Sequence, residues 1–146
     1  MNNYKSLNHC QYLVQYHLIW CPKFWFSVLK GNVETSLKRI LAEIAHKYEY
    51  EIIEMEVMPD HIHLFVGTKP TVASTDVVRI FKSISAIRLF EEYPTLKQFY
   101  ARCGSLWSKG YFVSTIGKVS SDTVRRYIQE QKKVIDDAKN STKAKA

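Results

Sequence analysis

Cysteine is scarce in this sequence, and the three that occur form no recognisable set. Cys10, Cys21 and Cys103 are odd in number and lie far apart along the chain. A disulfide framework needs paired cysteines and a structural zinc site needs closely spaced ones, so the sequence supports neither. We expect all three to be reduced residues of the core.

Long apolar runs are also absent. No stretch approaches the roughly 18 consecutive apolar residues of a membrane-spanning helix, and the segment Met1–Asn8 is too polar for a signal peptide. Neither an internal repeat nor a linker interrupts the chain. We therefore expect a cytoplasmic protein with no membrane partner.

Acidic residues are outnumbered by basic ones. The chain has 14 Asp and Glu against 21 Lys and Arg, which gives a formal net charge of +7. This excess favours an anionic partner, with nucleic acid as the first interpretation and an anionic membrane as the competing one. With 146 residues, 46% of them hydrophobic, the chain suffices for one core. We expect a single domain over residues 1–139 and a disordered tail over 140–146.

The spacing of the apolar residues predicts the order of the secondary structure. Alternation with period two, or strand-forming composition, predicts strands at 12–20, 51–58, 61–68 and 111–116. A spacing of three and four residues predicts helices over about 33–50, 75–93 and 120–138. The segment 95–110 is expected to be irregular.

Finer features follow from the same patterns. In the strand 51–58, Glu54 and Glu56 are expected to point outward, whereas Met55 and Val57 point inward. The second helix is expected to begin at a Ser74 or Thr75 cap. Its buried face is predicted to consist of Val77, Ile80, Phe81, Ile84 and Ile87.

The order β, α, β, β, α, β is that of a ferredoxin-like α+β sandwich with a split βαβ arrangement and an antiparallel sheet. Here an additional C-terminal helix follows it. Because this fold hosts many unrelated functions, individual residues must indicate the activity.

Two histidines flank an isoleucine in the strand predicted at 61–68. Since strand side chains alternate between faces, His61 and His63 project to the same side, with Cα atoms about 6.5–7 Å apart. Both rings can then reach one divalent cation. The alternative is a pair of histidines on a solvated sheet face, and the triplet alone does not decide between the two.

On the last predicted helix, Tyr127 and Gln131 stand four residues apart and so share one face. A separate stripe of Val124, Ile128 and Ile135 is suited to packing on the protein. Tyr127 and Gln131 are thereby available to a site, although an amphipathic surface helix with a partly buried tyrosine explains the same pattern.

Four separated motifs then carry a resemblance that covers nearly the whole chain. They are Tyr16–Lys23 (YHLIWCPK), Met58–Leu64 (MPDHIHL), Leu106–Val113 (LWSKGYFV) and Val124–Gln131 (VRRYIQEQ). In content and order they resemble the single-tyrosine HUH transposases, the small TnpA-type enzymes that move insertion sequences as single-stranded DNA. The resemblance implies a DNA transposase.

The resemblance also implies roles for individual residues. Tyr127 would be the nucleophile that forms a covalent 5′-phosphotyrosine, while His61, His63 and Gln131 would hold a metal. Two imidazoles and an amide oxygen suit Mg²⁺ or Mn²⁺. Family members recognise hairpins at element ends, and they act as homodimers in which the tyrosine helix of one subunit completes the histidine site of the other. The sequence does not choose between action in cis and in trans.

Basic residues outside the metal site suggest a track for the DNA backbone, against the alternative of an ordinary solvated face. The candidates are Arg79, Lys82, Lys109, Lys118, Arg125, Arg126 and Lys132. One loop departs from the family: after Pro22 and Lys23, relatives usually carry a tyrosine and arginines, whereas this chain has Phe24, Trp25 and Phe26. These aromatic residues either stack on unpaired bases or belong to the core.

Two other functions remain open. A domesticated or replication-type HUH nuclease shares the chemistry but serves another DNA process. A non-catalytic ferredoxin-like binder of single-stranded nucleic acid would use sheet-face aromatics instead of a metal, although its usual basic–glycine–aromatic signature is absent.

Overall fold

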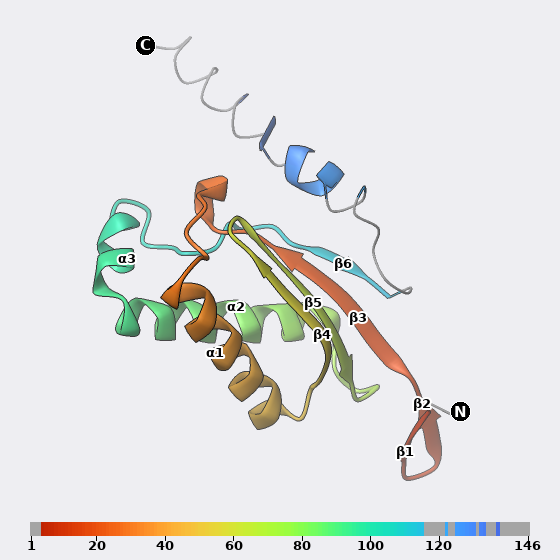
Figure 1. Ribbon diagram of the computed structural model, residues 1–146. Coiled ribbons are helices and arrows are strands. Elements are labelled where there is room, and N and C mark those ends of the chain that lie inside the picture. The colour runs from red at the N-terminus through yellow and green to blue at the C-terminus, as the bar shows by residue number, and fades with distance from the viewer. Residues whose placement is uncertain (1–3, 116–121, 123–124, 131, 134–136, 138–146) are drawn as a thin grey trace.

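The fold is organised around a four-stranded antiparallel sheet. The computed structural model describes residues 4–115, 122, 125–130, 132–133 and 137. The strands lie in the order β4-β5-β3-β6, and both long helices cover the same face of the sheet (Figure 1). The elements are β3 (Val14–Trp20), α1 (Asn32–Tyr48), β4 (Glu51–Met58), β5 (His61–Thr68), α2 (Ser74–Glu92) and β6 (Phe112–Ser114). This order and strand arrangement confirm the predicted ferredoxin-like α+β fold.

Four short elements lie outside the predicted pattern. An antiparallel hairpin of β1 (Lys5–Leu7) and β2 (Cys10–Tyr12) precedes β3, so the strand predicted at 12–20 begins two residues later than expected. A 3₁₀ turn, η1 (Lys23–Trp25), follows β3, and α3 (Pro94–Phe99) occupies part of the segment expected to be irregular. Each is too short to produce a visible periodicity, although proline at the first position of α3 is favourable for a helix start.

The core lies between the sheet and the two long helices. Ile62, Leu64 and Val66 of β5 are fully buried beneath α1 and α2, as are Leu18 and Trp20 of β3. The helices supply the facing side chains, which are Leu37, Ile40, Leu41, Ile44, Val77, Val78, Phe81 and Leu89. Burial of each such side chain stabilises the fold by roughly 1.5–3 kcal/mol, so this layer holds the sheet against the helices. No helix of the described residues is long and apolar enough to cross a membrane.

The predicted face of α2 is partly wrong. Ile87 is 60% exposed, and Ser85 takes its place in the buried row. Two residues along a helix correspond to a rotation of about 200°, so Ile87 lies opposite to Ser85. The N-cap is Ala73 and makes no side-chain capping bond, so the expected cap at Ser74 or Thr75 is wrong as well.

In β4 a bulge shifts the register between Ile52 and Glu54. The bulge leaves Ile53 42% exposed, while Glu54 is half-buried. Beyond it the predicted alternation holds, because Glu56 is exposed and Val57 is buried. Ile53 is thus the extra residue of the bulge, and the regular alternation of side chains continues from Glu54 onward.

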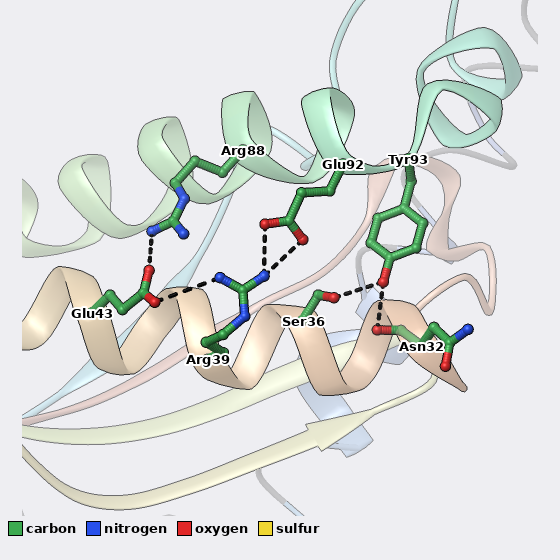
Figure 2. Close-up of polar contacts among 7 residues, drawn as sticks. All are labelled: Asn32, Ser36, Arg39, Glu43, Arg88, Glu92 and Tyr93. Carbon is green, nitrogen blue, oxygen red and sulfur yellow. Dashed lines mark hydrogen bonds and ion pairs between the residues drawn. The ribbon is translucent and has the colours of Figure 1, made fainter.

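Ion pairs join the two long helices (Figure 2). Arg39 of α1 donates to both carboxylate oxygens of Glu92 on α2, at 2.6 and 2.8 Å, and Arg88 of α2 reaches back to Glu43 of α1. The hydrogen bond with Glu92 raises the pKa of Arg39, and the hydrogen bond with Arg39 lowers the pKa of Glu92. These pairs are largely exposed, so they fix the helix register more than they stabilise the fold.

Tyr93 ties the end of α2 to the beginning of α1. Its hydroxyl donates to the carbonyl oxygen of Asn32 at 2.8 Å and lies 2.6 Å from the hydroxyl of Ser36 (Figure 2). The chain therefore leaves α2 at a fixed point before it continues into α3.

A buried hydrogen bond between α2 and the segment before β6 yields a stability prediction. The indole nitrogen of Trp107 donates to the hydroxyl of Ser85 at 3.0 Å, and both residues are buried. Ser85→Ala leaves this donor without its partner, and we expect the free energy of unfolding to fall by about 1–3 kcal/mol. Urea unfolding followed by circular dichroism measures the change.

Ser83→Ala is the matched control, since Ser83 lies on the same helix but is exposed. It gains the same helix propensity and loses no buried bond. Equal urea midpoints for the two variants would contradict the assigned role of Ser85.

Candidate functional site

Two histidines lie on the sheet face that α1 and α2 leave uncovered. Along β5, half-buried residues alternate with buried ones, so His61 and His63 share one face while Ile62 and Leu64 point into the core. Their side chains are only 15% and 16% exposed. The structure thus gives the shared orientation that the His–Ile–His spacing predicts.

Each histidine lies near a carboxylate that the sequence pattern did not assign to the site. Nδ1 of His61 is 2.9 Å from Oδ1 of Asp60, the residue before it. Glu56 pairs with His63 across β4 and β5, with its carboxylate 4.0 Å from Nδ1. The carboxylate of Asp60, within hydrogen-bond distance of Nδ1, fixes the ring of His61 and its tautomer and leaves Nε2 of His61 to bind a ligand. The pairing of the hairpin around Pro59 and Asp60 is the signal that places Glu56 beside His63.

A third imidazole lies against the pair. His17 of β3 is buried, and its ring is 5.2 Å from that of His63 in an edge-on contact and 4.0 Å from the ring of Phe65. His17 pairs with Phe65 across the two strands. The buried ring of His17 therefore packs against the ring of His63 and supports its position.

The sheet register brings the tyrosine helix to the same face. His63, Ile19 and Phe112 form one row across β5, β3 and β6, and paired residues of neighbouring antiparallel strands project to the same side. The ring of Tyr127 lies 6.1 Å from that of Phe112. Residues 125–130 are helical and lie on the side of the sheet away from α1 and α2 (Figure 1). Tyr127 is thus on the histidine face of its own chain, beside the row that His63 begins.

Tyr127 is held as a neutral phenol in this position. Its hydroxyl is buried and has no hydrogen-bond partner among the described residues. Burial raises the pKa of Tyr127, and the nearby Cys21 adds to the rise. A neutral phenol is a weak nucleophile, so any reaction of Tyr127 needs an added positive charge or a change of its position.

Cys21, at the end of β3, is a buried free thiol, whereas Cys10 and Cys103 are free and exposed. The expectation that all three belong to the core is therefore right for one of them. Burial raises the pKa of Cys21 to about 12, which keeps the thiol protonated and unreactive.

The His pair fits a divalent cation as far as the described residues extend. Those residues contain no group of three His, Cys, Asp or Glu side chains that could hold a metal. Two imidazoles with a carboxylate behind one of them form a suitable half-site for Mg²⁺ or Mn²⁺. Gln131, the predicted third ligand, lies outside the described residues.

Lys82 is engaged within the protein. Its ammonium, on α2, donates to the carbonyl oxygens of Ser108, Lys109 and Gly110, at 2.7, 3.3 and 3.3 Å. Burial lowers its pKa. The same segment is bonded to the end of β3, where the backbone N–H of Ser108 donates to the carbonyl of Cys21. Lys82 therefore ties α2 to the segment that leads into β6.

The other basic candidates are placed differently. Arg79 is exposed, with its guanidinium 3.3 Å from the carboxylate of Asp76. Lys109 is also exposed, although its backbone carbonyl accepts a hydrogen bond from Lys82. Both line a groove of about 500 Å³ between α2 and residues 104–111. On the last helix, Arg125, Arg126 and Lys132 are exposed, and Lys118 lies outside the described residues. Among the described candidates, all except Lys82 thus have exposed side chains.

Comparison with known proteins gives consistent results. The family description "Transposase IS200 like" matches residues 10–131. The ISDra2 transposase TnpA of Deinococcus radiodurans is 42% identical over 82% of this chain and 85% of its own length. The transposase for the insertion sequence element IS200 of Salmonella typhimurium is 29% identical over 90% of this chain and 85% of its own.

A solved structure resembles the fold as a whole. The crystal structure of a Deinococcus radiodurans protein assigned as a transposase aligns with a TM-score of 0.81 and 37% identity, over 87% of this chain and 97% of that one. All of these relatives carry transposase in their names, which favours a transposase over a non-catalytic binder.

The contribution of the Lys82 hydrogen bonds to stability can be measured by substitution. Lys82→Met keeps the aliphatic stem but removes the ammonium from three carbonyls, and we expect the free energy of unfolding to fall by about 1–3 kcal/mol. Lys109→Met, the same substitution at a nearby exposed position, is expected to change it by less than about 0.5 kcal/mol. Thermal unfolding with both variants measures the difference. A Lys82→Met protein as stable as the control would show that the three hydrogen bonds contribute nothing.

Proposed function

This chain belongs to the family of IS200-like transposases, and we propose that it cleaves and rejoins single-stranded DNA at insertion-sequence ends through Tyr127. The observation that carries the proposal is the presence of Tyr127 and of the His61–His63 pair on one sheet face. A nucleophile and a pair of metal-ligating side chains are the two parts that phosphodiester transfer requires.

The proposed reaction begins when the phenol oxygen of Tyr127 attacks phosphorus. The bond from phosphorus to the tyrosine oxygen forms as the bond to the 3′ oxygen breaks. The phenol proton passes to solvent, and the departing 3′ oxygen takes up a proton to become a hydroxyl. The DNA is left as a 5′-phosphotyrosine, which keeps the energy of the broken bond, so a 3′ hydroxyl can later reverse the step on another strand without ATP.

His61, His63 and Gln131 are proposed to hold a divalent cation, Mg²⁺ or Mn²⁺. Such a cation offsets the charge that develops on the phosphate and favours the phenolate of the nucleophile. Asp60 holds the ring of His61 in the orientation that leaves Nε2 free for this role.

The DNA substrate is proposed to be a single strand with hairpins near the element ends. The exposed cations suit a phosphate backbone, and the excess of 21 Lys and Arg over 14 Asp and Glu supports the same partner. The residues proposed to contact the backbone are Arg79, Lys109, Lys118, Arg125, Arg126 and Lys132. Lys82 is proposed to act by positioning residues 108–110 and not by direct contact.

We further propose that two copies of the chain act together, with Tyr127 of one subunit serving the histidines of the other. A chain of 146 residues has one candidate site, whereas an element has two ends to be cut and joined. Burial raises the pKa of Tyr127 on its own chain, so the reaction needs an added positive charge or another position of Tyr127, and a shared site supplies the second.

The first test is a covalent adduct. Incubation with single-stranded DNA that carries an end hairpin, together with Mn²⁺, is expected to give a protein–DNA species that survives a denaturing gel. Tyr127→Phe is expected to abolish it, because phenylalanine has no nucleophile, and His61→Ala is expected to reduce it at least about a hundredfold.

Tyr48→Phe is the control, since Tyr48 is an exposed tyrosine of α1. An adduct that persists in Tyr127→Phe would refute the nucleophile, and full cleavage in the presence of EDTA would refute the role of the histidines.

The second test mixes two inactive variants. If sites are shared, a heterodimer of His61→Ala and Tyr127→Phe subunits contains one site with an intact histidine pair and an intact tyrosine. Random pairing of the two variants in equal amounts makes half of the dimers heterodimers, so we expect the mixture to regain about a quarter of the wild-type adduct, as measured on the same gel. A mixture as inactive as its components would show that Tyr127 acts in cis.

A further inference from the structure

Three phenylalanines form an exposed aromatic cluster beside the histidine face. We define this cluster as Phe24, Phe26 and Phe99, which are 40%, 44% and 58% exposed. The ring of Phe26 lies 5.7 Å from that of Phe24 and 5.2 Å from that of Phe99. Single exposed apolar residues are ordinary, but a contiguous group of aromatic rings marks an interaction surface.

The backbone is strained to present these rings. Phe24 and Trp25 both have positive φ, 63° and 52°, a conformation that costs an L-residue with a bulky side chain about 1–2 kcal/mol. Trp25 turns into the core and is 8% exposed, whereas its two neighbours point outward. The turn therefore separates one buried ring from two exposed ones.

Several bonds hold this strained turn in place. The N–H of Lys23 donates to the carbonyl of Leu106 at 2.7 Å, and the hydroxyl of Tyr100 donates to the carbonyl of Lys23 at 3.1 Å. Tyr100 is buried and lies under the cluster, with its ring 5.1 Å from that of Phe99. The cluster thus rests on a fixed base.

The cluster lies at the histidine end of the sheet. Trp20 pairs with Ile62, so the residues after Trp20 come level with the Asp60–His61 turn. After the cluster, the N–H of Leu29 donates to the carbonyl of Pro59 at 3.0 Å. The loop that carries Phe24 and Phe26 is therefore joined at both ends to the neighbourhood of His61.

The two segments that build the cluster carry charge of one sign. These segments, 22–30 and 94–109, contain five basic residues and no acidic one. The ammonium of Lys23 lies 6.0 Å from the centre of the Phe24 ring. The basic residues are Lys23, Lys30, Lys97, Arg102 and Lys109. Aromatic faces on segments with basic and no acidic residues suit the flat bases and charged phosphates of an unpaired strand.

We propose that Phe24, Phe26 and Phe99 form a stacking platform for unpaired bases of the DNA strand that enters the site of His61 and His63. This inference rests on the proposed function for the identity of the strand. Stacking is tolerant of sequence, because every base has a π-face, so the platform holds the strand near the cut without selecting a base.

The experiment compares binding to two strands that differ only in their bases. One is a short fluorescent homothymidine oligonucleotide, and the other is an abasic strand of the same length and charge. Binding is measured by fluorescence anisotropy in EDTA, so that no cleavage occurs. The variants are Phe26→Leu, Phe99→Leu and Phe26→Tyr, with Tyr48→Leu as an exposed aromatic control remote in sequence.

A stacking platform predicts a specific pattern. The two leucine variants are expected to bind homothymidine about tenfold more weakly and the abasic strand as tightly as the wild type, because leucine keeps apolar volume but has no π-face. Phe26→Tyr and Tyr48→Leu are expected to bind both strands as the wild type does.

Other outcomes overturn the proposal. An equal loss on both strands would mean that the rings act only by supporting the fold. Unchanged DNA binding, with a change of oligomeric state in sedimentation, would identify the cluster as a protein interface. The covalent adduct assay on the same proteins separates the two claims. If the variants show the stacking pattern but the wild type forms no adduct, the proposed cleavage is refuted. If the wild type forms the adduct but the leucine variants lose no base-dependent binding, the platform is refuted.

Discussion

The alternation of side chains along β5 is the constraint on which the site depends. This strand is hydrogen-bonded on both sides, to β4 and to β3, and its Ile62, Leu64 and Val66 are fully buried. A slip of one residue in the pairing would expose those three side chains and drive His61 and His63 into the core. The hydrophobic layer beneath α1 and α2 therefore fixes the direction of both imidazoles before any ligand is bound.

The part of the histidine face that carries Phe112 and Tyr127 depends on elements that pack on the end of β3. Lys82, Ser108 and Cys21 connect α2, the segment before β6 and β3 through hydrogen bonds. The same connection sets the register of Phe112, against which Tyr127 lies. Side chains from distant parts of the sequence thus converge on one face, and hydrogen bonds from a half-buried ammonium to backbone carbonyls help to hold the strands in line.

Much of the fold follows from the sequence because its signals are local. The strands 51–58 and 61–68 are found as predicted, since the turn at Pro59 and Asp60 separates two clear strand segments. The orientation of His61 and His63 follows from the same alternation. What the sequence does not reveal depends on tertiary contacts. Ile87 fits the helical period yet faces solvent, and Lys82 has the charge of a surface residue although its ammonium is committed to three carbonyls. The metal-binding and DNA-contact roles, those of Gln131 and Lys118 included, stay predictions.

The bulge in β4 has a consequence for the solubility of the protein. β4 is an outer strand of eight residues, and such an edge can recruit the edge of another molecule through its unpaired backbone groups. The register shift between Ile52 and Glu54 interrupts the regular edge there, and charged side chains lie on either side of it: Glu51, which is paired with Lys5, and Glu56. A bulge and charged side chains both disfavour the pairing of such an edge with a second copy of itself. The edge of the sheet that lies beside the histidine strand is in this way a poor template for pairing with a second molecule.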